Sequence, residues 1–93
     1  MRLDLLLKSF CLVKTRSQGK KGCEAGRIRV NGLAAKPSRE MAPGDLVEIG
    51  YPDRELLVEV IEVPDGQVSR KERDRYYRVV RERRRPEGPR LDL

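Results

Sequence analysis

Residues 16–32 read RSQGKKGCEAGRIRVNG, and this stretch decides the fold that the sequence predicts. It begins as a short basic helix, which Thr15 is placed to cap and which Gly26 can end in a left-handed conformation. A half-buried strand follows at 27–30, and Asn31 with Gly32 is a strong hairpin signal because both residues tolerate positive φ. The stretch holds five Lys or Arg residues and one acid, so the helix and hairpin should present a surface suited to a polyanion.

A first helix is expected upstream of this stretch. Its apolar residues recur at the spacing of one buried helical stripe, namely Leu3, Leu6, Leu7, Phe10 and Cys11. Asp4 falls in the first turn, where a carboxylate suits the positive end of a helix. Taken alone, Arg2 and Asp4 fit a capped and solvated helix start.

Two glycines in the second helix need a reason. Gly19 and Gly22 each cost about 1 kcal/mol relative to alanine inside a helix. Either the backbone closely approaches the first helix or a ligand at these positions, or the glycines are simple drift. The sequence leaves both readings open.

The remainder of the chain predicts an α+β fold with a short antiparallel sheet. After the hairpin return at 33–35 and a turn at 43–45, strands are expected at 46–49 and 55–63, with Val58 and Val60 on one face. A basic helix is expected at 70–84, and Pro86 should halt it. We therefore divide the chain into a module at 1–68, a C-terminal basic helix at 69–85 and a disordered tail at 86–93.

Charge indicates the class of partner. The 93 residues suit one domain, and their formal net charge is +6. Residues 1–50 hold ten Lys or Arg and five acids, residues 51–68 hold one and five, and residues 69–93 hold ten and five. Two basic segments thus flank an acidic one, which favours an anionic partner such as nucleic acid or an anionic membrane surface.

Several function classes are disfavoured by composition. The chain has no histidine to act as a general base, and a cysteine nucleophile would lack its usual base. No glycine spacing matches a nucleotide-binding loop, and two cysteines without histidine cannot make an ordinary structural zinc site. We therefore predict a non-enzymatic protein with no metal and no cofactor.

The cysteines and the apolar segments bear on location. Cys11 and Cys23 fall on the apolar sides of the two N-terminal helices, so we interpret them as core residues with reduced thiols; a disulfide or redox role is the alternative. No secretory segment and no apolar run long enough to span a bilayer is present, which predicts a cytoplasmic protein. The narrow apolar face of the last predicted helix also disfavours adsorption to membranes.

A binding surface is easier to build than an active site. The basic residues of the helix and hairpin are Lys14, Arg16, Lys20, Lys21, Arg27, Arg29 and Lys36. If they share one face, phosphate contacts would dominate affinity and make it depend steeply on salt. Aromatic residues are few, so recognition of folded RNA by shape and backbone fits better than base stacking on single strands. Duplex DNA and a solvated basic surface with no specific partner remain open on charge alone.

Five short motifs fall in order along residues 1–50: Arg-Leu-Asp at 2–4, Lys-Thr-Arg-Ser at 14–17, Gly-Arg-Ile-Arg-Val-Asn-Gly at 26–32, Lys-Pro-Ser at 36–38 and Pro-Gly-Asp at 43–45. In order and spacing they resemble the small RNA-binding module first seen in ribosomal small-subunit protein four. Length and C-terminal extension are similar to its stand-alone bacterial members, heat-shock protein fifteen and the ribosome quality-control factor RqcP. The resemblance implies a helix–helix–hairpin RNA-binding module of the αL type.

The resemblance also implies partners and site residues. The partner would be the large ribosomal subunit carrying a stalled peptidyl-tRNA, with contacts to both large-subunit rRNA and tRNA. The implied RNA-facing set is Arg2, Asp4, Lys14, Thr15, Arg16, Lys20, Arg27, Asn31, Lys36 and Ser38, to which charge adds Lys21 and Arg29. Within this set Asp4 would orient neighbouring basic groups without touching phosphate.

These observations together predict an RNA-binding protein acting on the large ribosomal subunit or its peptidyl-tRNA, in quality control or recycling of stalled subunits. Pseudouridine synthases and tyrosyl-tRNA synthetases carry the same module, but this chain has no room for their catalytic domains. A monomer is expected. The alternative is a protein–protein adaptor whose arginine-rich C-terminal helix docks on an acidic partner.

Overall fold

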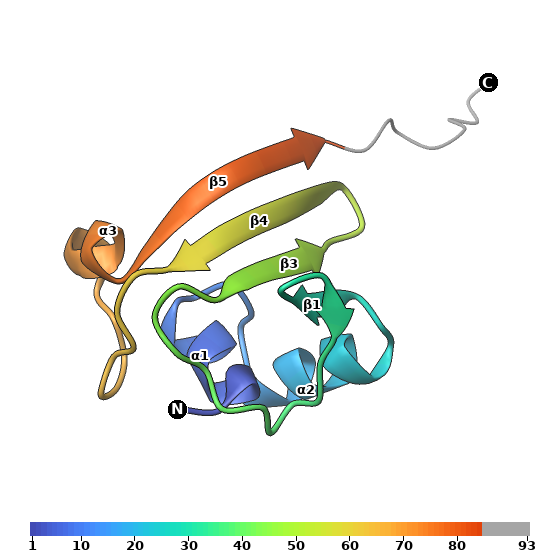
Figure 1. Cartoon of the computed structure of the whole chain (residues 1–93), viewed down its shortest axis with the longest axis horizontal. Helices are drawn as coiled ribbons and strands as arrows, with labels where there is room; N and C mark the ends of the chain where they lie inside the picture. Colours follow the sequence, from blue (N-terminus) through green and yellow to red (C-terminus); the bar gives the residue numbers. More distant parts are fainter. Residues whose placement is uncertain (85–93) are drawn as a thin grey trace.

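Within residues 1–84, the part of the chain that the computed structural model describes, the strands form one antiparallel sheet (Figure 1). In chain order they are β1 (Ile28–Val30), β2 (Leu33–Ala34), β3 (Leu46–Gly50), β4 (Arg54–Val60) and β5 (Tyr77–Arg84). Their order across the sheet is β2-β1-β3-β4-β5. The two helices near the N-terminus and this antiparallel sheet confirm the predicted α+β class.

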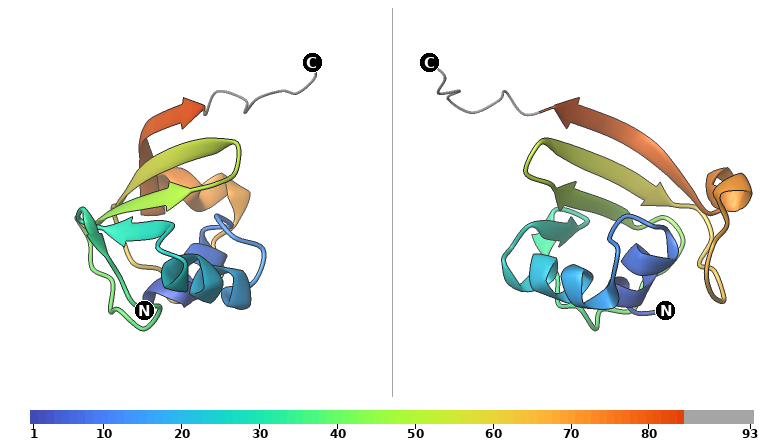
Figure 2. Two further views of the ribbon diagram at one scale, coloured as in Figure 1. Left: turned by 90° about the vertical axis from the view of Figure 1, so that its right-hand side faces the viewer. Right: turned by 180° about the vertical axis from the view of Figure 1, so that it is seen from behind.

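Two helices, α1 (Leu3–Ser9) and α2 (Arg16–Glu24), lie together on one side of the sheet, under β1 and β3 (Figures 1 and 2). The apolar stripe of α1 is confirmed, because Leu3, Leu6, Leu7 and Phe10 are fully buried. The prediction for Cys11 is wrong. The helix ends at Ser9, and Cys11 takes a positive φ of 60° that carries its side chain out of the stripe to solvent.

The ends of α2 are confirmed as predicted. The Thr15 hydroxyl oxygen accepts the N–H of Gln18 at 3.1 Å, and the Gln18 amide oxygen accepts the N–H of Lys14 at 3.0 Å. The first bond satisfies a donor that a helix start leaves free, and the second ties the residue before the cap to the first turn of the helix. At the other end Gly26 has a φ of 75°, which ends the helix and sends the chain into β1.

The glycines of α2 mark places of close approach. A Cβ at Gly19 would lie 3.3 Å from the backbone oxygen of Asp4 and 3.4 Å from Leu7 Cδ1, so α2 packs there against the backbone of α1. A Cβ at Gly22 would lie 2.7 Å from Ile28 Cδ1, the end of a flexible side chain. Close packing of the two helices therefore explains the glycine at position 19. The sequence alone could not decide between such packing and simple drift.

The sheet covers the helices with its inward-facing residues. Asn31 and Gly32 have φ values of 53° and 83°, which confirms the tight turn between β1 and β2. The alternation of β1, β3 and β4 then buries Ile28, Val30, Val47, Ile49, Leu56, Val58 and Val60. Together with the apolar stripe of α1, these residues form the hydrophobic core. Burying each such side chain stabilises the fold by roughly 1.5–3 kcal/mol.

The C-terminal segment differs from the prediction of a helix at 70–84. A 3₁₀ turn at Arg70–Glu72 and the short helix α3 (Arg73–Tyr76) are followed at once by β5. A strand forms here because β4 has a free edge. The whole of β4 pairs with β5, and Val79 lies opposite Val58. Tyr77 anchors the start of the strand, with its ring stacked 4.5 Å from that of Phe10. Pairing in the sheet outweighs the helical pattern, whose apolar content was thin.

The tail predicted at 86–93 lies outside the described residues. In the described part of the chain, no helix has both the length and the apolar character needed to cross a membrane.

Candidate nucleic-acid interface

A buried carboxylate links the two N-terminal helices. Asp4, in the first turn of α1, is only 2% exposed. Its carboxylate accepts hydrogen bonds from Arg2 Nε at 2.8 Å and Nη2 at 3.1 Å, and from Arg16 Nε at 3.2 Å. The side chains of Arg2 and Arg16 are 41% and 48% exposed, so both arginines are oriented by Asp4 and still accessible to a ligand.

Asp4 therefore belongs to a charged network and is not a solvated helix start. Burial by itself raises the pKa of Asp4, but the hydrogen bonds and positive charges of Arg2 and Arg16 outweigh it and hold the pKa below its ordinary value. The carboxylate thus stays ionised at neutral pH. No side-chain cap of the α1 N-terminus accompanies it.

The loop after β2 joins the same region. The N–H of Leu3 donates to Arg39 O at 2.8 Å and that of Asp4 donates to Pro37 O at 3.1 Å, so residues 36–39 run beside the start of α1. Lys36 and Ser38 are exposed on this loop. The backbone contacts thereby bring the loop that carries Lys36 and Ser38 beside the start of α1, where Arg2 and Asp4 lie.

The exposed side of α2 continues this basic region. Lys20 follows Arg16 by one helical turn and lies on the same side of the helix. Lys14 is exposed just before the helix, and Thr15 is occupied as its cap. We use the name α1–α2 surface for the group Arg2, Arg16, Lys20, Lys36 and Ser38, with Asp4 beneath it.

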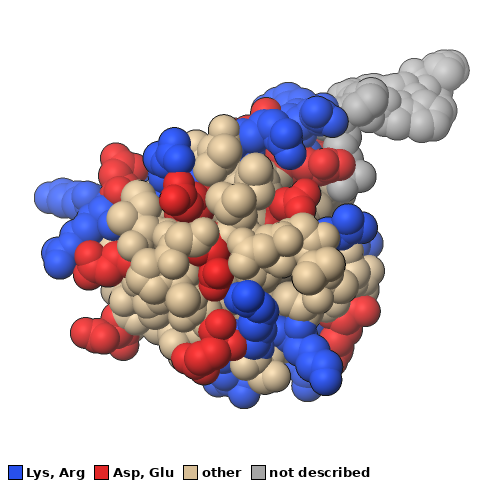
Figure 3. Space-filling model, in the orientation of Figure 1, with Lys and Arg blue, Asp and Glu red and all other residues tan. Residues whose placement is uncertain are grey.

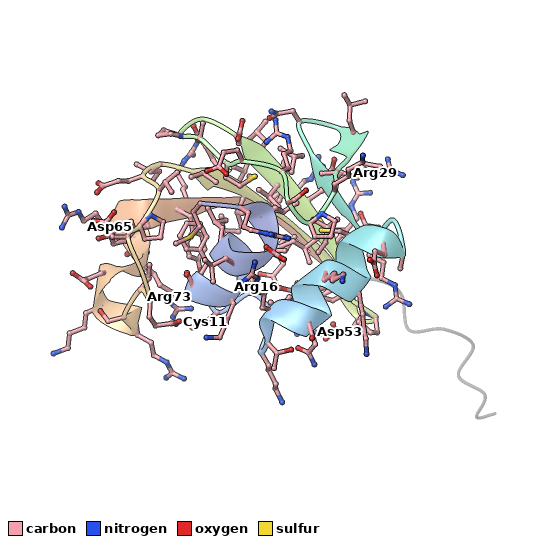
Figure 4. The ribbon with its side chains drawn as sticks, turned by 90° about the horizontal axis from the view of Figure 1, so that it is seen from below. Cys11, Arg16, Arg29, Asp53, Asp65 and Arg73 are labelled. Carbon is pink, nitrogen blue, oxygen red and sulfur yellow. The ribbon has the colours of Figure 1, made fainter. Side chains whose placement is uncertain are left out.

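Not all of the predicted basic residues share this surface. Because Ile28 and Val30 face the helices, the alternation of β1 turns Arg29 to the opposite face of the sheet, where its pairing partner is Glu48. Figure 4 shows Arg29 well away from Arg16. Lys21 and Arg27 line a groove on a further side of α2. The condition that all of these basic residues share one face is therefore not met by Arg29.

The Asn31 side chain ties the β1–β2 turn to the start of β3. Its side-chain oxygen accepts the N–H of Leu46 at 2.9 Å, and its amide donates to Asp45 at 3.1 Å. Asp45 also accepts from Arg39 Nη1 at 3.0 Å and from the N–H of Ala42 at 2.9 Å. Burial raises the pKa of Asp45, but these bonds outweigh it and leave the pKa below its ordinary value.

Arg39 and Asp45 were missed as parts of the site. They form a second acid-centred network beside the loop that holds Lys36 and Ser38. Asp45 could have been found from its motif, because Pro-Gly-Asp at 43–45 places an acid at a turn. The pairing of Asp45 with Arg39 has no comparable sequence signal.

On the rest of the described chain, acidic and basic side chains are mixed and some of them form ion pairs. On the face seen in Figure 3, acidic and basic side chains are interspersed. On β5 and α3, Arg78 bonds Glu59 at 2.6 Å and Arg75 pairs with Glu62 at 3.5 Å. An arginine-rich C-terminal helix, the surface on which the adaptor alternative depends, does not extend beyond Tyr76.

The described residues offer little for other chemistry. No group of three or more His, Cys, Asp or Glu within residues 1–84 could hold a metal ion. Burial, together with the charges of Asp4 and Glu24, raises the pKa of the Cys23 thiol to about 11, so it stays protonated at neutral pH. Cys23 is a core residue, as predicted.

The geometry of α1, α2 and the hairpin has a counterpart among known proteins, because residues 1–47 match the S4 domain. The chain belongs to the S4 domain family. This S4 domain covers both N-terminal helices and the hairpin and ends inside β3, so it contains the whole α1–α2 surface. The resemblance inferred from the five sequence motifs is confirmed.

The chain is also similar over most of its length to individual proteins. The chain is 37% identical over 84 residues to the RQC P-site tRNA stabilizing factor of Streptococcus pneumoniae, covering 90% of this chain and 94% of that protein. It is 34% identical over 82 residues to the protein of the same name in Bacillus subtilis, covering 88% and 94%. Among solved structures it is similar to Heat Shock Protein 15 of Vibrio cholerae, solved as a trimer, with a TM-score of 0.78, 29% identity, and coverage of 85% and 80%.

Proposed function

We propose that this S4 domain protein binds RNA in the cytoplasm, on the large ribosomal subunit and its peptidyl-tRNA, during ribosome quality control. The observation that carries the proposal is the network of Arg2, Asp4 and Arg16 on the α1–α2 surface. It holds two guanidinium groups on one carboxylate, and each group keeps further N–H donors for a phosphate. The role is binding, without a catalytic step or a cofactor.

The relatives support the choice of partner. Two of them carry the name RQC P-site tRNA stabilizing factor and align with about nine-tenths of this chain. A factor of that kind needs an arrangement of cations that matches the RNA backbone at several points at once. Arg2, Arg16, Lys20 and Lys36 offer such an arrangement, with rRNA and tRNA as the two RNA segments to be held together.

Within this surface the residues have different roles. Arg2, Arg16, Lys20 and Lys36 would contact phosphate directly, and Ser38 would add a hydroxyl donor. Asp4 would orient the two arginines, since its carboxylate would repel phosphate. Thr15 and Asn31 would act by fixing the start of α2 and the hairpin turn. Lys14, Lys21 and Arg27 flank the surface on the groove side.

Sedimentation of a cell lysate tests the proposal. The wild-type protein should migrate with free large subunits and with large subunits carrying peptidyl-tRNA, and should leave those fractions after nuclease digestion. The double variant Arg2→Ala/Arg16→Ala should remain at the top of the gradient. Migration with intact ribosomes alone, or with subunits equally for wild type and double variant, would contradict the proposal. Light scattering of the purified protein tests the predicted monomeric state separately.

A further inference from the structure

A groove runs between α2 and the turn that joins β3 to β4. Its volume is about 750 Å³, and its apolar floor includes Leu12, Val13, Ile28, Ile49 and Pro52. Along α2 it is lined by Gly22, beside which Ile28 packs, and by Ala25, whose side chain is a single methyl group. In Figure 4, which looks onto α2, the turn that carries Asp53 lies on this side of the molecule.

The groove has a basic rim. Lys14, Lys21 and Arg27 line it, while no acidic side chain of the described residues does. None of these three cations forms a salt bridge with residues 1–84. The groove therefore suits an occupant that combines an apolar part with negative charge.

One wall of the groove is an aromatic side chain in a fixed position. Tyr51 is half-buried, and its hydroxyl donates to Leu12 O at 2.6 Å. The guanidinium carbon of Arg54 lies 4.5 Å from the centre of its ring. A ring held in this way has little freedom to lose when a flat ligand packs beside it.

We propose that this groove binds one unpaired nucleotide of the RNA, with its base on the apolar floor beside Tyr51 and its phosphates against Lys14, Lys21 and Arg27. The inference rests on the proposed function and deepens it. It assigns a second RNA contact, on a different side of α2 from Arg16. This contact binds an extruded base, whereas the α1–α2 surface binds the phosphate backbone. The scarcity of aromatic residues is consistent with a site for one base, not a platform for a strand.

Two RNA hairpins test the proposal, one fully paired and one identical except for a single bulged nucleotide. Wild-type protein should bind the bulged hairpin about tenfold more tightly, a size typical of stacking one base on an aromatic side chain. Ala25→Leu should fill the groove and abolish the preference while leaving affinity for the paired hairpin unchanged. Ala34→Leu adds the same side chain on exposed β2, outside the groove, and should keep the preference.

A fluorescent base reports on the same contact directly. With 2-aminopurine as the bulged nucleotide, wild type and Ala34→Leu should change its emission on binding, and Ala25→Leu should not. Equal affinity of wild type for the two hairpins, or a bulge preference that survives Ala25→Leu, would overturn the inference while paired-hairpin binding still upheld the proposed function. Failure of wild type to bind either hairpin at physiological salt would reject both.

An acidic, leucine-containing peptide serves as the competing ligand. If it bound wild type but not Ala25→Leu, and wild type showed no bulge preference, the groove would be a protein-docking site and the inference would be wrong. If the bulged hairpin displaced it, the nucleotide assignment would be supported.

Discussion

Replacing Asp4 with asparagine removes the charge that orients Arg2 and Arg16 while keeping the shape of the side chain. The Asp4 carboxyl is buried, whereas the arginines are roughly half exposed. Breaking a fully buried pair costs about 3–5 kcal/mol, but water can solvate these guanidinium groups once the carboxylate is gone. We therefore expect the free energy of unfolding to fall by about 1–3 kcal/mol.

The effect on RNA binding follows from two opposing contributions. Loss of a negative charge makes the surface more positive, which strengthens attraction to phosphate by a few tenths of a kcal/mol at moderate salt. Loss of orientation frees two long side chains, each of which costs about 0.5–1.5 kcal/mol to immobilise on binding. The second contribution is larger, so Asp4→Asn should bind a large-subunit rRNA fragment roughly fivefold to tenfold more weakly.

The matched control is Glu24→Gln, which removes an exposed acid from the end of α2. Its stability should stay within about 0.5 kcal/mol of wild type, and its RNA affinity should be unchanged or slightly higher. Chemical denaturation gives the first quantity and fluorescence anisotropy with labelled RNA the second. If Asp4→Asn bound RNA as tightly as Glu24→Gln, the reasoning that Asp4 orients the arginines would be refuted.

Three further outcomes are expected. Gly19→Leu should destabilise the protein by about 1–3 kcal/mol in chemical denaturation, because the added side chain meets the backbone of α1. Asp4 and Asp45 have pKa values below their ordinary 3.8, so the stability that their ionised forms add to the folded state is fully present above that pH. Thermal unfolding should show it being lost as the pH falls through the folded-state pKa values. In native protein a thiol reagent should label exposed Cys11 quickly and buried Cys23 only on unfolding.

Each of these outcomes has a result that would contradict it. Unchanged stability of Gly19→Leu would mean that the helices can separate at no cost. If a variant lacking both carboxylates lost thermal stability at low pH as steeply as wild type, the pH dependence would come from other groups. Equal labelling of the two thiols in folded protein would show that Cys23 is accessible.

The N-terminal half of the fold could be predicted because its signals are local. A capping pair begins α2, a glycine with positive φ ends it, and Asn31 with Gly32 turns the hairpin. The burial of Leu3, Leu6, Leu7 and Phe10 follows from periodicity alone. These signals depend on neighbours within a few residues, and the structure confirms each of them.

The C-terminal strand could not be predicted in the same way. Residues 70–84 have helical spacing and a capping pattern, yet β5 forms because β4 offers a free edge and Phe10 offers a partner for Tyr77. Both features are remote in sequence. The same limit applies to the site, since only the folded sheet shows that Arg29 faces away from Arg16 and that Asp45 pairs with Arg39.

The dependence of RNA binding on salt tests most directly the claim that the α1–α2 surface contacts phosphate. Affinity for an rRNA or tRNA fragment is measured across a salt series for wild type, Arg16→Ala and Arg29→Ala. The two variants lose the same charge, one from helix α2 and the other from the face of the sheet that points away from the helices. Arg16→Ala should lower the log–log slope by about 0.7–0.9, the loss of one phosphate contact, while Arg29→Ala should leave it unchanged. An unchanged slope and affinity for Arg16→Ala, or an equal loss for Arg29→Ala, would contradict it.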